Sequence, residues 1–240
     1  MMKIRTIEQL QQHLDDDLAW RKKELTVIKS LVTTRASSAE MVNCYIRSGI
    51  ALLYAHWEGF IKAASVAYLT YVAAQRLTYS DLTNNFVAIA AKRLLNEAGL
   101  SNKVTVYAKV AEFFISGLAE RCSLPTEIET KSNLSSEVLR EITYTLGLDY
   151  REYEIKAKLI DEKLLKNRNE VAHGQYLLID KELFIDLHIE IVNLLDLFSN
   201  QVSNAASTKS YIRAAVARDE SPAELSYLTG GASSATLTRK

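Results

Sequence analysis

The chain has 240 residues, 48% hydrophobic and 24% charged, with only 8 glycines and 2 prolines, a composition that indicates a globular protein and excludes an intrinsically disordered or collagen-like one. Lysine plus arginine and aspartate plus glutamate both number 29, so the formal net charge is zero. Because no global field draws such a protein to nucleic acid or to a membrane surface, any site for a polyanion must be local.

Two long helices are predicted in the first third of the chain. The first covers about residues 6–32, with Thr6 at the N-cap position, and the second runs from the cap signal at Ser37 and Ser38 to about Arg76 without an interrupting proline. Their apolar residues recur every three or four positions, the period of one buried helix face. These positions are Leu10, Leu14, Leu18 and Leu25 in the first helix, and Val42, Ile46, Leu53, Trp57, Phe60, Ile61 and Tyr68 in the second.

The rest of the chain also favours helices, and nothing alternates with period two for long enough to suggest a sheet. The further helices are expected at about residues 85–98, 103–120, 135–146, 150–173 and 181–202. We therefore predict an all-α helical bundle with a long second helix, formed by residues 1–205. Residues 206–240 are rich in Ala, Ser, Thr and Gly, so they are expected to be a flexible tail, with a possible short helix over 210–218.

The chain lacks the usual signals of secretion and metal binding. Cys44 and Cys122 have no CxxC spacing and no nearby histidine, which favours buried free thiols in a reducing cytoplasm over zinc ligands. The N-terminus has no apolar signal segment, and the most apolar stretch, residues 50–74, contains His56 and Glu58. We expect a cytoplasmic protein that uses no metal and no cofactor and does not insert in a membrane.

One short segment stands above background: Arg168-Asn169-x-x-x-His173, followed by Gly174, near the end of the helix expected over 150–173. The C-terminal end of a helix favours imidazolium, and a histidine that titrates near neutrality suits general acid or base catalysis. An arginine suits the charge that develops on phosphate oxygens. Together these residues could cleave RNA without a metal, with Asn169 orienting either partner.

The helical register separates the two charged residues. At 100° per residue, Arg168 falls on an apolar stripe, where a guanidinium needs a carboxylate, carbonyl or phosphate partner. Asn169 and His173 share another stripe, about 100° or more away. A second copy of the helix, crossing the first, would bring two arginines and two histidines together, so we expect a homodimer. The apolar stripe is formed by Ile160, Leu164, Val171 and Ala172.

Several residues near this motif keep two interpretations. Glu58, on the very apolar second helix, either supports the site or forms a core ion pair with Arg168. Lys163 and Lys166 either hold an RNA backbone or belong to a solvated face, because acidic residues alternate with them. Trp57 is expected to pack in the core rather than stack on a base. Small residues on one face of the second helix are expected to let another helix approach closely.

The motif resembles the R-x4-6-H signature of the HEPN superfamily, and Leu53-Tyr54-Ala55-His56-Trp57-Glu58-Gly59-Phe60 resembles a segment of stand-alone bacterial HEPN families suspected to be toxins or phage-defence ribonucleases. The resemblance implies a dimeric, metal-independent endoribonuclease that leaves a 2′,3′-cyclic phosphate, with Arg168 and His173 as catalytic pair at the dimer interface. It also implies an RNA substrate and an antitoxin or defence-system partner protein. The alternative is a catalytically silent module that binds RNA or protein.

Overall fold

The computed structural model describes residues 4–34, 38–99, 103–125, 127–128 and 133–214. Within these ranges the chain forms eight α-helices, one π-helix and two 3₁₀ helices, η1 (Tyr79–Asp81) and η2 (Gly117–Ala119), and its only extended pairings are two isolated β-bridges. The predicted all-α class is confirmed. In this described part of the chain no helix combines the length and hydropathy that crossing a membrane requires.

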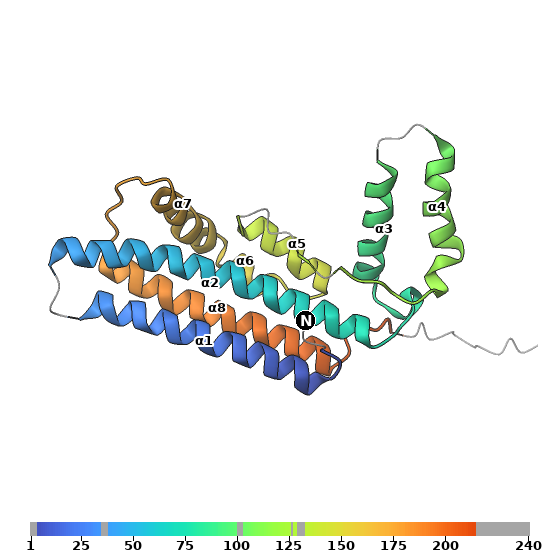
Figure 1. Cartoon of the computed structure of the whole chain (residues 1–240), viewed down its shortest axis with the longest axis horizontal. Helices are drawn as coiled ribbons and strands as arrows, with labels where there is room; N and C mark the ends of the chain where they lie inside the picture. The colour runs from blue at the N-terminus through green and yellow to red at the C-terminus, as the bar shows by residue number, and fades with distance from the viewer. Residues whose placement is uncertain (1–3, 35–37, 100–102, 126, 129–132, 215–240) are drawn as a thin grey trace, which may run out of the picture.

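Three long helices form the body of the fold: α1 (Ile7–Thr33), α2 (Ala39–Ala74) and α8 (Lys181–Ser207). They lie side by side along the longest axis of the molecule (Figure 1). Thr6 is the N-cap of α1, as predicted, and it forms a capping box with Gln9: the Thr6 side chain accepts from the Gln9 backbone, and the Gln9 side chain accepts from the Thr6 backbone. The leucines predicted to line the core side of α1 are all buried.

Two glycines allow the close packing of α2 against its neighbours. A Cβ atom added at Gly49 would lie 2.6 Å from the Phe184 ring of α8, and one added at Gly59 would lie 2.7 Å from Nη1 of Arg21 on α1. Side chains at these positions would force their neighbours to shift, so the predicted role of small residues on α2 is confirmed. Trp57 is fully buried, as expected of a core residue.

Two histidines are buried inside the three-helix body. His56 on α2 places Nε2 2.8 Å from a carboxylate oxygen of Glu24 on α1. His188 on α8 places Nε2 3.0 Å from the backbone oxygen of Leu25, also on α1. Burial, which disfavours the charged imidazolium, lowers the pKa of both histidines below the ordinary value of 6.5.

Helices α3 (Asn84–Ala98) and α4 (Val104–Ile115) form a hairpin that projects from one end of the body (Figure 1). The helix predicted over 103–120 is too long, because the backbone leaves the helical region at Ser116, where φ is −128°, and continues as η2. The hairpin contacts α5, and Phe86 at its base is buried beside Tyr68 of α2. The hairpin does not contribute to the region around Arg168.

A second layer of short helices lies over α2 (Figure 1). It consists of α5 (Ser136–Leu146), α6 (Arg151–Glu154), the π-helix η3 (Leu159–Leu165) and α7 (Lys166–Ala172). The prediction of one continuous helix over 150–173 is wrong. The first helix ends with α6, and the next one begins as the wider π-helix η3. Each residue of a π-turn advances by less than 100°, so α7 is rotated from the predicted register. Ala172, predicted to lie on the apolar stripe, is exposed as a result.

The C-terminal part of the described chain stays attached to the body. Helix α8 continues past residue 205, and Tyr211 is buried, with its backbone oxygen accepting a 3.0 Å hydrogen bond from Thr83. Residues 210–214 form a turn and a bridge instead of the start of the helix expected over 210–218. Most of the expected tail, residues 215–240, lies outside the described ranges.

The two cysteines differ in their surroundings. Cys122 is buried, as predicted, but Cys44 is exposed, so the expectation of two buried thiols is wrong for Cys44. It lies in the first turns of α2. Both are free thiols.

Candidate active site at the end of α7

The π-helix before α7 is fixed to its surroundings. Ile160 and Leu164 of η3 are fully buried. Between them, Asp161 accepts hydrogen bonds from the backbone nitrogen (2.8 Å) and the hydroxyl (2.5 Å) of Ser136, the first residue of α5. A carboxylate is stabilised there by the positive end of the α5 dipole. Helix α7 thus starts from an anchored turn, and π-turns inside helices are frequent at functional sites.

Arg168 extends from α7 onto α2. Its side chain is 21% exposed, and its Nη2 lies 3.8 Å from Oε2 of Glu58. The guanidinium carbon lies 3.8 Å from the centre of the Tyr54 ring, and Nη1 donates a 2.7 Å hydrogen bond to Oδ1 of Asn169. An aromatic face and a carboxylate are the partners that a partly buried guanidinium needs. The ion pair between Arg168 and Glu58, one of the two interpretations of the sequence, is present.

Glu58 connects this arginine to a wider polar network on α2. Its side chain is 14% exposed, and its carboxylate also forms an ion pair with Lys62, one helical turn later, with Nζ 3.1 Å from Oε1. The neighbouring Tyr54 hydroxyl accepts a 2.6 Å hydrogen bond from the Leu134 backbone. Burial raises the pKa of Tyr54, and the negative charge of Glu58 adds to the effect. The Glu58 carboxylate is therefore shared between two cations.

His173 ends α7 and is exposed. Gly174 follows it with φ of 71°, and the backbone nitrogens of Gly174 and Gln175 donate to the oxygens of Val171 (3.1 Å) and Glu170 (2.9 Å). These two bonds form a Schellman motif, so the predicted helix end at Gly174 is confirmed. The His173 ring makes no hydrogen bond or ion pair with the described residues. The imidazole is thus held by its backbone and open to solvent.

Within one chain, Arg168 and His173 leave α7 in different directions. Residues five apart on an α-helix differ by about 140°. Arg168 faces α2 and is bonded to Asn169, and no hydrogen bond between the described residues joins either side chain to His173. The structure thus brings Arg168, Asn169 and Glu58 together and leaves His173 apart from them. A site that uses both side chains needs a second copy of the helix or a movement of the Arg168 side chain.

The two lysines predicted to contact RNA lie on the open side of this region. Lys163 and Lys166 are exposed, and neither forms an ion pair with the described residues. Nδ2 of Asn167 donates a 2.7 Å hydrogen bond to the backbone oxygen of Lys163, but the lysine ammonium groups themselves make no hydrogen bond with the described residues. Their ammonium groups therefore have no fixed partner in the described part of the chain.

Two residues near α7 were not assigned a role from the sequence. The ring of Tyr54 stacks against the Arg168 guanidinium, and Arg47 donates a 2.9 Å hydrogen bond from Nη2 to the backbone oxygen of Gln175. Arg47, Tyr54 and Glu58 are separated by seven and four residues, which places them on one face of α2. That spacing is the signal in the sequence that could have identified the face covered by α7.

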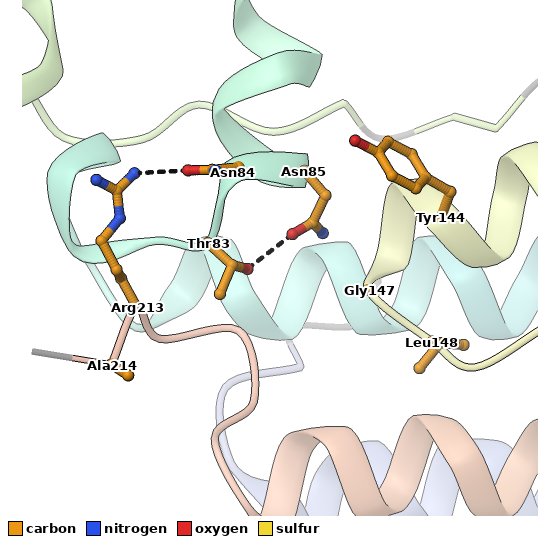
Figure 2. Close-up of a pocket in the computed structure, with 8 residues that line it drawn as sticks. All are labelled: Thr83, Asn84, Asn85, Tyr144, Gly147, Leu148, Arg213 and Ala214. Atoms are coloured by element: carbon orange, nitrogen blue, oxygen red, sulfur yellow. Dashed lines mark hydrogen bonds between the residues drawn. The ribbon is translucent and has the colours of Figure 1, made fainter. Parts of the chain in front are cut away.

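Two cavities in the described part of the chain are lined by residues outside α7. One, of about 570 Å³, lies between the start of α3 and the end of α5 (Figure 2). There Arg213 donates to Asn84 at 3.1 Å, and Thr83 donates to Asn85 at 2.7 Å. The Arg213–Asn84 bond ties the C-terminal segment to α3, and the Thr83–Asn85 bond is local to the start of α3, so both have a structural role. The other, of about 540 Å³, borders Gly59 and the following turns of α2.

The described residues contain no group of three or more His, Cys, Asp or Glu side chains placed to hold a metal ion. Comparison with known proteins gives one match: a family model described as RiboL-PSP-HEPN matches residues 16–204. The matched range includes both the segment around Glu58 and the whole of α7. No curated protein and no solved structure matches the chain.

Proposed function

We propose that this chain, which belongs to the RiboL-PSP-HEPN family, is a metal-independent endoribonuclease with His173 and Arg168 as its catalytic residues. The observation that carries the proposal is the different state of the two side chains. His173 is exposed on a fixed helix end with no protein partner among the described residues, whereas Arg168 is held ready against Tyr54 and Glu58. An exposed titratable group and a prepositioned cation are what acid–base cleavage of a phosphodiester needs.

In the proposed reaction, neutral His173 takes the proton of a ribose 2′-hydroxyl, and the 2′-oxygen attacks the adjacent phosphorus. The bond from phosphorus to the 5′-oxygen of the next nucleotide breaks, and that oxygen receives a proton from an imidazolium or from water. The products are a 2′,3′-cyclic phosphate and a free 5′-hydroxyl. No oxidant, metal or cofactor is required, because the RNA itself supplies the nucleophile.

Arg168 would stabilise the negative charge on the phosphate oxygens during the attack. Its present partner, Glu58, is also paired with Lys62 at 3.1 Å. When a phosphate replaces Glu58 at the guanidinium, the carboxylate keeps one cation and is not left as an unpaired buried charge. Asn169, bonded to Nη1 at 2.7 Å, would keep the guanidinium plane oriented during this exchange.

The catalytic pair would be completed by a second copy of the chain. Because Arg168 and His173 diverge on α7, a two-fold axis beside this helix would place the arginine of one protomer opposite the histidine of the other. Lys163 and Lys166, exposed on the same segment, would border the groove between the two copies and hold the RNA backbone.

We further propose that this ribonuclease acts as a toxin or phage-defence effector in the cytoplasm, controlled by an antitoxin or other partner protein. Expression of the wild-type chain would then arrest bacterial growth, and expression of His173→Ala would not. Equal growth of both strains, at equal protein levels, would contradict the toxin role without excluding cleavage.

The direct test of the activity is incubation of the purified protein with total RNA in EDTA. Wild type is expected to cleave the RNA, and His173→Ala is expected to lose cleavage. His13→Ala is the matched control, because His13 lies on α1, remote in sequence from the motif, and should keep full activity. Background cleavage by all three proteins would overturn the proposal.

The second candidate is a silent module that binds RNA or protein. It is favoured by the internal contacts of Arg168, since a guanidinium held by Tyr54 and Glu58 can serve packing alone. In that case Arg168→Ala would lower the melting temperature substantially while RNA or partner binding persists. Lost cleavage at an unchanged melting temperature would contradict it.

A further inference from the structure

Arg47 differs from the other arginines that the fold shields from solvent. Among the described residues, three arginines are buried or partly buried: Arg21, Arg47 and Arg168. Arg21 is paired with Asp17 at 3.0 Å, and Arg168 is paired with Glu58. Arg47 has no carboxylate within 4.0 Å in the described part of the chain, so its charge is not balanced by a neighbour.

The side chain of Arg47 has hydrogen-bonding capacity that the protein does not use. A guanidinium has five N–H donors. One Nη2 donor reaches the Gln175 backbone oxygen at 2.9 Å, and Nε is buried without a partner. A partly desolvated cation without a counter-charge is unfavourable for stability, because its lost hydration is not repaid. This cost makes the position a candidate for binding an anion.

Arg47 lies next to the C-terminal end of α7. Gln175, the residue that Arg47 contacts, is two residues after His173, and its own backbone nitrogen closes the Schellman motif on Glu170. Arg47 therefore lies against the turn that presents the exposed imidazole. The turn is thus contacted by a cation from α2, and this cation is a different residue from Arg168, which faces Tyr54 and Glu58.

We infer that Arg47 binds an RNA phosphate beside His173, as a substrate-binding residue separate from Arg168. This inference rests on the proposed ribonuclease function. The planar guanidinium suits a phosphate, which it contacts with two parallel N–H donors. The hydrogen bond to Gln175 fixes one edge of the guanidinium and leaves other N–H donors for the RNA. Arg47 would therefore both stabilise the turn after His173 and bind the phosphate.

The test measures binding of a 2′-O-methyl RNA oligonucleotide, which cannot be cleaved through a 2′-hydroxyl. Affinity is measured by fluorescence anisotropy over a range of KCl concentrations for the full chain. Arg47→Gln keeps an N–H donor for the Gln175 oxygen but removes the charge, and Arg47→Lys keeps the charge. Arg93→Ala, which removes an exposed arginine of α3, is the control.

Loss of one phosphate contact on a single strand lowers the slope of log affinity against log salt by about 0.7. We expect this decrease and a five- to tenfold weaker affinity at low salt, by order of magnitude, for Arg47→Gln, with Arg47→Lys and Arg93→Ala retaining the wild-type slope. An unchanged slope in folded Arg47→Gln overturns the inference and leaves the ribonuclease proposal standing. Unchanged slope with a changed oligomeric state assigns the counter-charge to a partner protomer and also overturns it. If wild type shows no salt-dependent binding, the proposed function fails together with this inference.

Discussion

The guanidinium of Arg168 lies over the ring of Tyr54, 3.8 Å from its centre, so the arginine of the motif is stacked on the long helix α2 before any substrate arrives. This contact and the neighbouring Glu58 remove most of the freedom of a long side chain. A fixed cation loses less entropy when it binds a phosphate than a mobile one, which is consistent with a role in stabilising charge.

Arg168→Lys tests whether the positive charge of this side chain is sufficient or whether the planar guanidinium is also needed. Lysine keeps the positive charge for Glu58 but cannot stack as a plane on Tyr54 or contact a phosphate with two parallel donors. We expect RNA cleavage to fall by about 10²-fold or more, with a loss of unfolding free energy of about 1 kcal/mol or less. The measurements are single-turnover cleavage and thermal denaturation. Cleavage within a factor of two of wild type would show that the planar guanidinium is not used.

Gly174→Ala tests whether the turn after His173 must keep its geometry. Gly174 has φ of 71° and open space around it, so an added Cβ costs only backbone strain, about 1–2 kcal/mol. We expect this loss of stability together with at least a tenfold loss of cleavage, by order of magnitude, because the imidazole is displaced.

Gly99→Ala is a control for that variant at another glycine with positive φ. Gly99 also has a positive φ, 59°, and no neighbour within 4 Å, but it ends α3 in the projecting hairpin. It should lose stability without losing cleavage per folded molecule. Equal effects of the two variants on cleavage would mean that the Gly174 turn has no special relation to activity.

The buried histidines predict how stability depends on pH. Burial lowers the pKa of His56 and His188, so as pH falls through about 6.5 the unfolded chain takes up protons that the folded chain resists. The stabilisation is complete above pH 6.5 and is lost below it. We expect a lower melting temperature at pH 5 than at pH 7.5, measured by circular dichroism.

The double variant His56→Gln/His188→Gln should reduce this difference, and His13→Gln should not. Carboxyl groups with a lowered pKa, such as Asp149 at about 2, titrate below this range and do not account for it. A pH dependence that persists unchanged in the double variant would show that other groups cause it.

Mixing two inactive variants tests whether the site is shared between protomers. In a two-fold dimer, co-expressed Arg168→Ala and His173→Ala chains form heterodimers in which one composite site keeps both residues. Random pairing then restores about one quarter of the wild-type activity per dimer. Complete absence of cleavage, with heterodimers demonstrated by mass spectrometry, would place Arg168 and His173 in one protomer's site.

The sequence was most informative where local chemistry decides the structure. Leucine spacing and the cap at Thr6 predicted α1, and Gly174 predicted the end of α7, because apolar period, capping and positive φ are properties of a few neighbouring residues. The Arg168–Glu58 pair was also accessible, since a guanidinium on an apolar stripe requires a carboxylate partner.

The rest depends on packing between distant segments, which periodicity does not contain. Replacement of a continuous helix by α6, η3 and α7 follows from the burial of Ile160 and Leu164 and from the bond between Asp161 and Ser136, 25 positions apart. The contact between Arg47 and Gln175 joins residues separated by 128 positions. No local pattern predicts such a contact.

The most direct test of the central claim uses a DNA oligonucleotide that contains a single ribonucleotide, incubated with the purified protein in EDTA. If His173 moves the 2′-hydroxyl proton, the strand is cut only after the ribonucleotide, mass spectrometry finds a 2′,3′-cyclic phosphate and a 5′-hydroxyl, and His173→Ala gives no product. Cutting at deoxynucleotides, ends with a 5′-phosphate, or equal cutting by His173→Ala would contradict the account.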